Sequence, residues 1–255
     1  MVIQKNDIKI IASEHLSRYP DIVCGISTRN GCVETKLYDF NMSYFVGDRE
    51  QNVKMNRKHF LDELGITIEQ LAIPKQVHSD IVIKIDKPGD YESCDALITN
   101  KQNIFLTVIV ADCVPIFIYD PKTKSIAAVH AGWRGSISKV VEKTIRLMET
   151  SFKVKINDLI AFIGPSAGVC CYEVGKEVAE KFESKYLTKK LDKRIFLDLK
   201  LFNKDLLIKC GVNENNIETC NLCTICNPTI FHSYRRDGKH SGRMMGIIGR
   251  REPAG

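Results

Sequence analysis

A cysteine beside a histidine supports two kinds of chemistry. Imidazole can activate a thiolate as a nucleophile. One thiolate and two imidazoles can instead bind a zinc ion and leave a fourth position open for water. The chain has 255 residues, with ten cysteines and six histidines. Among them, Cys113 and His130 are the pair that the local sequence is expected to bring together.

A predicted β-hairpin sets the distance between these two residues. Its turn has the sequence Asp-Pro-Lys-Thr-Lys, which strongly favours a reversal of the chain. If Tyr119 pairs with Ser125, His130 lies opposite Val114, one residue from Cys113. Directly opposed residues in antiparallel strands have Cβ atoms about 5 Å apart. We therefore expect Cys113 and His130 to meet at the open end of the hairpin.

A zinc site needs a third protein ligand, and His78 is the best candidate. It lies in residues 74–80 (Pro-Lys-Gln-Val-His-Ser-Asp), a short polar turn expected just before a strand. Ligands often lie in loops fixed on a scaffold, although a histidine before a strand can also be an ordinary turn residue. The remaining histidines are in charged, glycine-rich or unassigned contexts: His15, His59, His232 and His240.

Composition predicts a cytoplasmic globular protein. Lys and Arg number 37 against 31 Asp and Glu, a formal net charge of +6. The basic residues are not gathered in blocks, so we expect no nucleic-acid partner. The N-terminal segment has no apolar signal core. No apolar run approaches the roughly 20 residues of a membrane span, so we expect no membrane association.

Strand and helix patterns alternate along the chain. They predict an α+β fold, with mixed β-sheets and flanking helices in a single compact domain over residues 1–255. The predicted strands cover residues 22–27, 81–85, 104–110, 114–119, 125–130 and 159–163. The predicted helices cover residues 53–64, 136–150, 173–184 and 199–210. Gly65 and Gly211 are expected to end the first and last helices, and Asp198 is expected to cap the last.

Several local motifs resemble one known family. In chain order they are residues 75–79 (Lys-Gln-Val-His-Ser), 94–99 (Cys-Asp-Ala-Leu-Ile-Thr), 111–115 (Ala-Asp-Cys-Val-Pro), 130–135 (His-Ala-Gly-Trp-Arg-Gly) and 233–238 (Ser-Tyr-Arg-Arg-Asp-Gly). Shorter matches include Ser27-Thr28-Arg29, Asn56-Arg57 and Cys223-Thr224. Together they are similar to the YfiH-like family. Its members have been labelled multicopper polyphenol oxidases or laccase-domain proteins, and later purine nucleoside phosphorylases.

The resemblance implies a function and a site. His78, Cys113 and His130 match the family's metal ligands and catalytic centre, with zinc as the metal and copper possible. The implied reactions are phosphorolysis of adenosine, inosine, guanosine and methylthioadenosine, together with adenosine deamination. Purine nucleosides and phosphate are then the partners of a monomer or homodimer. Two positions depart from the family pattern: Gly31-Cys32 replaces a Gly-Gly pair, and Phe231-His232 replaces an aromatic pair.

Further roles are assigned by residue type. Asp95 is preferred over Asp112 for orienting a histidine or moving a proton, because Asp112 in a strand would face away from Cys113. Phosphate favours forked arginine donors. Arg29 ranks first among the candidates, which also include Arg235 and Arg243.

Three alternative functions stay open. A copper-dependent polyphenol oxidase would need more histidines than the six present to hold several coppers. A metal-free cysteine hydrolase would use Cys113 with His130, and a non-enzymatic binding role would need neither. Cys220, Cys223 and Cys226 are interpreted as structural because no fourth ligand follows them, and Cys170-Cys171 is interpreted in the same way.

Overall fold

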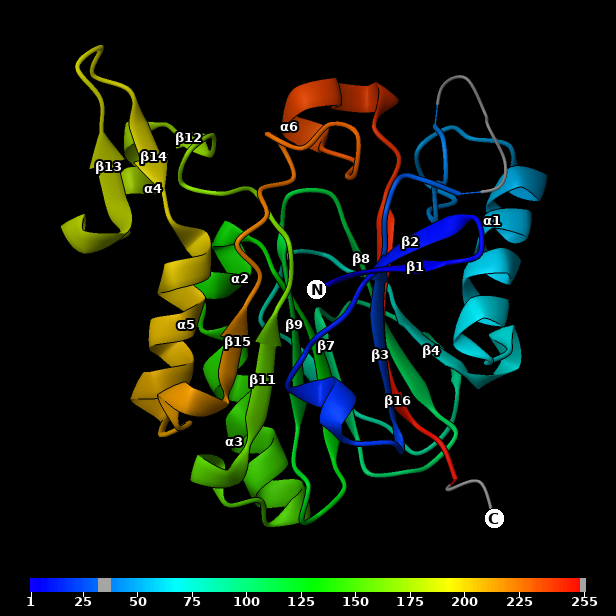
Figure 1. The fold of residues 1–255 in the computed structure, drawn as a ribbon. Helices are drawn as coiled ribbons and strands as arrows, with labels where there is room; N and C mark the ends of the chain where they lie inside the picture. The colour runs from blue at the N-terminus through cyan, green and yellow to red at the C-terminus, as the bar shows by residue number, and fades with distance from the viewer. Residues whose placement is uncertain (32–37, 253–255) are drawn as a thin grey trace.

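Two β-sheets pack face to face in the computed structural model, which describes residues 1–31 and 38–252 (Figure 1). Cys32 lies outside the described residues. The larger sheet contains, in order, β1 (Val2–Lys5), β2 (Ile8–Ile11), β3 (Ile22–Ser27), β16 (Met244–Arg250), β8 (Phe105–Val110), β4 (Leu71–Pro74) and β6 (Gly89–Tyr91). The second contains β15 (Ile217–Thr219), β11 (Ile160–Ile163), β9 (Val114–Tyr119), β10 (Ile126–Ala131), β7 (Ala96–Thr99) and β5 (Val82–Lys84). A small third sheet contains β12 (Glu173–Val174), β14 (Ile195–Leu197) and β13 (Leu187–Lys189).

Helices cover the outer faces of both main sheets (Figure 1). The α-helices of the described residues are α1 (Glu50–Leu64), α2 (Trp133–Ile137), α3 (Val140–Phe152), α4 (Lys176–Ala179), α5 (Leu199–Cys210) and α6 (Tyr234–Asp237). Residues of α1 pack on the larger sheet, and residues of α3 and α5 pack on the second. Parallel and antiparallel pairings occur in both main sheets, so the predicted α+β class is confirmed. None of the helices described is both long and apolar enough to cross a membrane.

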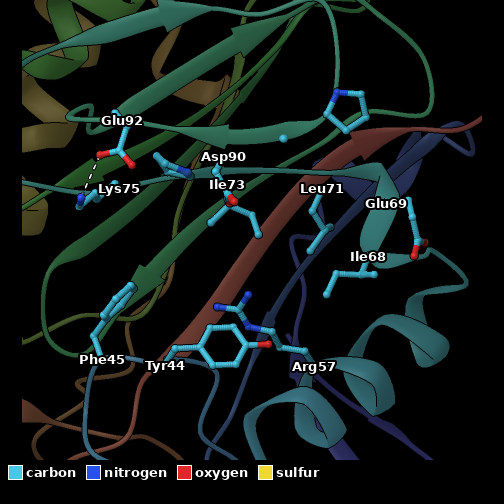
Figure 2. Close-up of a pocket in the computed structure, with 13 residues that line it drawn as sticks. Tyr44, Phe45, Arg57, Ile68, Glu69, Leu71, Ile73, Lys75, Asp90 and Glu92 are labelled. Atoms are coloured by element: carbon cyan, nitrogen blue, oxygen red, sulfur yellow. Dashed lines mark ion pairs between the residues drawn. The ribbon is translucent and has the colours of Figure 1, made fainter. Parts of the chain in front are cut away.

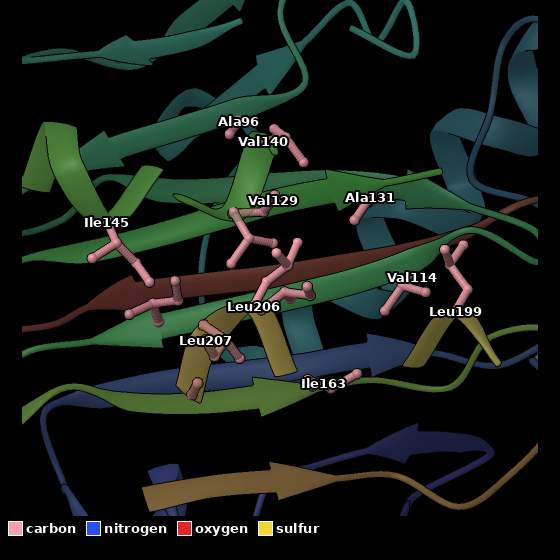
Figure 3. Packing of buried hydrophobic residues seen from close by; sticks show 14 of the residues in the cluster. Ala96, Val114, Val129, Ala131, Val140, Ile145, Ile163, Leu199, Leu206 and Leu207 are labelled. Atoms are coloured by element: carbon pink, nitrogen blue, oxygen red, sulfur yellow. The ribbon is translucent and has the colours of Figure 1, made fainter. Parts of the chain in front are cut away.

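Alternation along the strands explains the layers. Val114 of β9 and Val129 of β10 point outward to α3 and α5 (Figure 3). Phe117 of β9 points inward and joins Val108 of β8 in the core between the sheets. Because side chains alternate between faces, His130 lies on the inner face, opposite to Val129. The sheet sandwich thus turns a histidine toward the other sheet at the end of a strand.

Local signals placed two helices correctly. α1 ends at Leu64, and Gly65 follows in the left-handed conformation with φ 63°, as predicted from the sequence. Asp198 caps α5 by accepting a hydrogen bond from the Leu201 amide, and Gly211 follows with φ 104°. Both ends were expected because the capping residues act within one turn of the chain.

Two other helix predictions are wrong in extent. The helix expected over 136–150 is divided, because α2 ends at Ile137 and Lys139 takes a left-handed conformation before α3 begins. The apolar spacing continues across this break, so the pattern indicated one helix. The α-helix in the segment 173–184 is limited to the short α4. The segment begins with β12, which pairs with β14, and Gly175 is extended. Pairing with a distant strand outweighs the local helical pattern there.

The hairpin is present, but its predicted register is wrong by one residue. Tyr119 pairs with Ile126, and His130 pairs with Pro115. The turn is longer than expected because the Asp120 carboxylate accepts hydrogen bonds from the backbone amides of two turn residues, Lys122 and Thr123. The strands expected over 104–110 and 114–119 also belong to different sheets.

Candidate metal and substrate site

Three segments converge at one end of the sheet sandwich. The chain crosses between the sheets after β8 and before β9, and Cys113 is the last residue of this crossing. Asp112, just before it, has φ 91°, so the strand is broken there. His130 comes from the end of β10. His78 comes from the turn after β4 and has φ 59°.

These segments bring together the predicted residues His78, Cys113 and His130. Their ligand atoms all lie within 4.8 Å of one another. Cys113 Sγ is 4.0 Å from His78 Nε2, and the two imidazole rings meet edge to face with centroids 4.9 Å apart. Tetrahedral zinc with ordinary bond lengths would need a sulfur–nitrogen separation of about 3.6 Å. The donor types and spacing therefore fit a zinc ion after a small contraction.

Asp95 links the two histidine segments. Its Oδ1 lies 2.7 Å from His130 Nδ1 and accepts a hydrogen bond from the His78 amide at 3.0 Å. Its Oδ2 accepts from the amide and hydroxyl of Ser79 at 2.6 and 2.7 Å. Because Nδ1 is held by Asp95, Nε2 is the His130 nitrogen left for a metal. Asp95 therefore fixes the orientation of the His130 ring and anchors the His78 turn.

Charge coupling among Cys113, His130 and Asp95 shifts the pKa of each group. Burial would raise the pKa of the Cys113 thiol, but His130 and His78 lower it to about 6. Burial would lower the pKa of His130, whereas Cys113 and Asp95 raise it to about 9. Burial likewise would raise the pKa of Asp95, but hydrogen bonds from His130 and Ser79 lower it to about 2. Asp95 is thus a carboxylate at neutral pH and Cys113 is largely a thiolate.

A glycine permits the close approach of these side chains. A Cβ atom at Gly132 would lie 3.2 Å from Cys113 Sγ and 3.1 Å from the His78 ring. Gly132 follows β10 directly, in the segment that begins with His130. A larger residue at this position would push on two of the three candidate ligands.

The cluster opens into a cleft of about 530 Å³. Besides His78, Cys113 and His130, its wall includes Phe45, Arg57, Tyr234 and Arg243. A second cleft of about 590 Å³ adjoins it and shares Phe45 and Arg57 (Figure 2). In this second cleft, the Arg57 guanidinium lies 4.4 Å from the centre of the Tyr44 ring. The two clefts therefore share part of their walls, and the first of them contains the cluster.

The predicted phosphate-binding arginines have different surroundings. Arg243 lines the cleft, and its side chain donates to the carbonyls of Ser241 and Gly242. The Arg29 side chain pairs with Asp39 and donates to Pro228, outside the described cleft wall. The Arg235 guanidinium lies 5.4 Å from the centre of the Tyr172 ring. Of the three predicted arginines, Arg243 is the one that the structure places against the cluster's cleft.

Arg57 is a cleft residue that the sequence reasoning missed. It is largely buried on α1, on the helix face that also carries Val53 and Phe60. Its Nε donates to the Met42 carbonyl at 2.8 Å. A charged residue on an otherwise apolar helical face was the available signal, because such a residue needs a polar partner or ligand.

Two further candidates have other surroundings. Asp112 accepts hydrogen bonds from Thr224 Oγ1 at 2.6 Å and from the Arg235 amide at 2.7 Å, so it ties loops together. His232 is buried outside the cleft wall. Burial, with Arg29 and Arg243 nearby, lowers the pKa of His232 to about 3.

Four other cysteines form a second cluster. The thiols of Cys170, Cys171, Cys223 and Cys226 lie within 4.8 Å of one another. The expectation that the ligand set around Cys223 and Cys226 is incomplete is therefore wrong. Cys170 and Cys171 complete the set from more than fifty residues away, and Cys220 is outside the cluster.

Known proteins similar to this chain share most of its length. The family described as multi-copper polyphenol oxidoreductase laccase matches residues 23–251. A Clostridium acetobutylicum protein named purine nucleoside phosphorylase is 35% identical over 225 residues, covering 85% of this chain and 94% of that protein. A Bacteroides thetaiotaomicron protein of the same name is 32% identical over 266 residues, covering 97% and 98%.

Solved structures show the same fold. The crystal structure of the Bacillus licheniformis hypothetical protein YfiH has a TM-score of 0.89 at 29% identity, covering 97% of both chains. That of YlmD from Geobacillus stearothermophilus has a TM-score of 0.91 at 27% identity, covering 98% of this chain and 99% of that one.

Proposed function

The chain belongs to the multi-copper polyphenol oxidoreductase laccase family, and on that premise we propose that it is a zinc-dependent purine nucleoside phosphorylase. The proposed substrates are adenosine, inosine, guanosine and methylthioadenosine with inorganic phosphate. Adenosine deamination at the same site is a second proposed activity. Two relatives that match most of the chain are named purine nucleoside phosphorylases, which supports the first activity.

One observation carries the proposal. A single cleft contains a thiolate–imidazole cluster, two arginines and two aromatic side chains. Phosphorolysis needs an anion site and a flat apolar site for the base, with the ribose held between them. The cleft has a residue of the right chemistry for each of these contacts.

Arg57 and Arg243 are the proposed phosphate donors. Guanidinium groups suit phosphate because they present parallel N–H donors and stay charged. Arg57 is held by the Met42 carbonyl and Arg243 by two carbonyls, so neither side chain is anchored by a carboxylate in a described ion pair. Their positive charge is thus available to an anion. A phosphate oxygen held there would attack the ribose anomeric carbon as the bond to the purine nitrogen breaks.

Phe45 and Tyr234 are the proposed walls of the base site. Both side chains are exposed and line the cleft of the cluster. Aromatic rings stack against purines through their faces. Because Phe45 is exposed within the cleft wall, its ring is free to cover a bound base.

His78, Cys113 and His130 are the proposed zinc ligands. Zinc held there would supply Lewis-acid activation of water near neutral pH, which deamination requires. Asp95 keeps the His130 ring oriented through Nδ1. Its low pKa makes it a poor proton donor, so its proposed role is positioning rather than proton transfer. Copper in the same ligands is the alternative metal.

A metal-free cysteine hydrolase is the second candidate function. Cys113, His130 and Asp95 form a chain from nucleophile to base to orienting carboxylate, and the lowered pKa of Cys113 favours a reactive thiolate. His78 then has no assigned part, which weighs against this candidate. A four-copper oxidase is less well supported, since one histidine-containing cluster occurs among the described residues.

Product analysis tests the proposal. Purified protein with adenosine or inosine, with and without phosphate, should release base and ribose phosphate only when phosphate is present. Adenosine should also yield inosine. A hydrolase would turn over its substrates after metal removal and lose activity to iodoacetamide, whereas the proposed enzyme loses both reactions when its metal is removed.

A further inference from the structure

The four-cysteine cluster lies between two loops. Cys170 and Cys171 follow β11, and Cys223 and Cys226 follow β15. These two strands pair in parallel, and the pairing continues beyond them as a bridge between Ser166 and Cys223. The sheet itself therefore brings the loops together, and the thiols meet where the regular strands have ended.

The spacing of the thiols fits one metal ion after a small expansion of the cluster. Cys226 Sγ is 3.2 Å from Cys170 Sγ and 3.0 Å from Cys171 Sγ. In a tetrahedral zinc tetrathiolate, sulfur atoms are about 3.8 Å apart. A disulfide would need a sulfur–sulfur distance of about 2.05 Å and would join only two of the four thiols. Cys226 approaches two partners equally, which a shared ion explains and a single disulfide does not.

The Cys223 segment has the form of a metal-binding turn. Cys223 and Cys226 are separated by two residues, the spacing common in structural zinc sites. The Gly168 amide donates to Cys223 Sγ at 3.2 Å, an interaction that stabilises a thiolate. A Cβ at Gly168 would lie 3.3 Å from Cys170 Sγ and 3.1 Å from Cys223 Cβ. The backbone thus approaches the sulfurs as closely as a ligand cage requires.

Lys200 is a buried cation beside this cluster. Its ammonium group donates to the carbonyls of Cys220 and Leu222 at 2.8 and 3.1 Å, without a carboxylate in any described ion pair. Burial lowers the pKa of Lys200, and the nearby acidic groups oppose this shift in the order Cys220, Cys223, Asp198 and Cys170. A zinc ion with four thiolates carries a net charge of −2, and a buried lysine would offset part of that charge.

We propose that Cys170, Cys171, Cys223 and Cys226 bind a structural zinc ion that joins the loops following β11 and β15. The ion is four-coordinate and closed to substrate, unlike a site with an open position. Its position gives it a structural consequence. Thr224, next to Cys223, and Ala167, near Cys170, both bond to Asp112, the residue before Cys113. The joined loops therefore hold the segment that presents Cys113 to the cleft.

Metal counting in single and double variants separates this site from the proposed catalytic one. Cys113→Ser removes a ligand of the His78 cluster, so that variant should keep about one zinc per chain. Adding Cys226→Ser, an exposed position, should remove the remaining zinc. Adding Cys220→Ser instead, in the same segment but outside the cluster, should leave it bound. Zinc and iron would both be measured by elemental mass spectrometry.

The zinc content of these variants either supports or overturns the proposal. Zinc retained in the Cys113→Ser protein and lost with Cys226→Ser supports the proposal, whatever the outcome of the activity assays. A Cys113→Ser protein without zinc, or one that keeps its zinc after Cys226→Ser, overturns it. Wild-type protein gives a second test without substitution. Stripped under reducing conditions and titrated with Co²⁺, it should show the intense absorption of tetrahedral tetrathiolate coordination, and its absence would contradict the assignment.

Discussion

His130 Nδ1 lies 2.7 Å from Asp95 Oδ1, and both side chains are buried. The same carboxylate accepts hydrogen bonds from the His78 segment. One acidic side chain therefore fixes two of the three candidate ligands, although they come from different parts of the chain. Substitution of Asp95 therefore tests whether the cluster is preorganised for a metal.

Asp95→Asn should weaken metal binding at the His78 cluster by about 10- to 100-fold, the effect usual for outer partners of ligating histidines. The amide would keep the size of the side chain but replace one acceptor with a donor. Competition with a zinc chelator measures the affinity, preferably in a Cys226→Ser background to remove the second cluster. Asp86→Asn, the same change at an exposed position outside the cluster, is the control and should have no effect. Equal affinities for the two variants would contradict the positioning role.

Arg57→Lys and Arg243→Lys should each raise the KM for phosphate by about 10- to 100-fold. A hydrogen bond to a charged group contributes about 1.5–3 kcal/mol, and lysine cannot reproduce a guanidinium fork. Steady-state kinetics with varied phosphate at saturating inosine measures the change. Arg29→Lys and Arg235→Lys are the matched comparisons, because the sequence favoured these positions and the structure places them outside the cleft wall. Larger effects at Arg29 or Arg235 would contradict the assignment of Arg57 and Arg243 and would support the phosphate-binding arginines predicted from the sequence.

Gly132→Ala should reduce metal content, because its Cβ would lie 3.1 Å from the His78 ring and 3.2 Å from Cys113 Sγ. The methyl group must displace at least one of the two side chains. Zinc per chain and melting temperature, measured together, separate loss of the site from loss of the fold. A variant with full metal content and unchanged activity would show that the cluster is looser than its distances indicate.

His232 should make the protein less stable as the pH falls below about 6.5. Burial lowers its pKa to about 3, so between these values the unfolded chain binds a proton that the native protein does not. The lost stability is on the order of 1–2 kcal/mol at about pH 5. Urea unfolding of wild type and His232→Phe at about pH 5 and pH 7.5 measures it. The variant should show the smaller difference between the two pH values, and an unchanged pH dependence would contradict the buried neutral histidine.

Sequence reasoning succeeded where the physical signal was local. The ends of α5 follow from a capping aspartate and a terminal glycine within one turn of the helix. Cys113 and His130 meet as predicted despite the register error. Cys113 lies one residue before β9 begins. The register error therefore shifts the strand pairing by one residue but leaves Cys113 and His130 close together.

The errors occur where distant segments decide the structure. The four-cysteine cluster joins residues more than fifty positions apart, and their meeting depends on the β11–β15 pairing, which no local pattern specifies. Arg57 reaches the cleft because of how α1 packs against the larger sheet. The divided helix near Lys139 kept its apolar spacing, so periodicity could not reveal the break.

The most direct measurement is the product distribution from inosine and adenosine with zinc-loaded wild-type protein, with Cys113→Ser as the matched inactive form. We expect phosphate-dependent formation of free base and ribose phosphate by wild type, inosine from adenosine, and neither reaction in the variant. Equal turnover by the Cys113→Ser protein, or no turnover by wild type under any metal loading, would contradict the proposed function of this site.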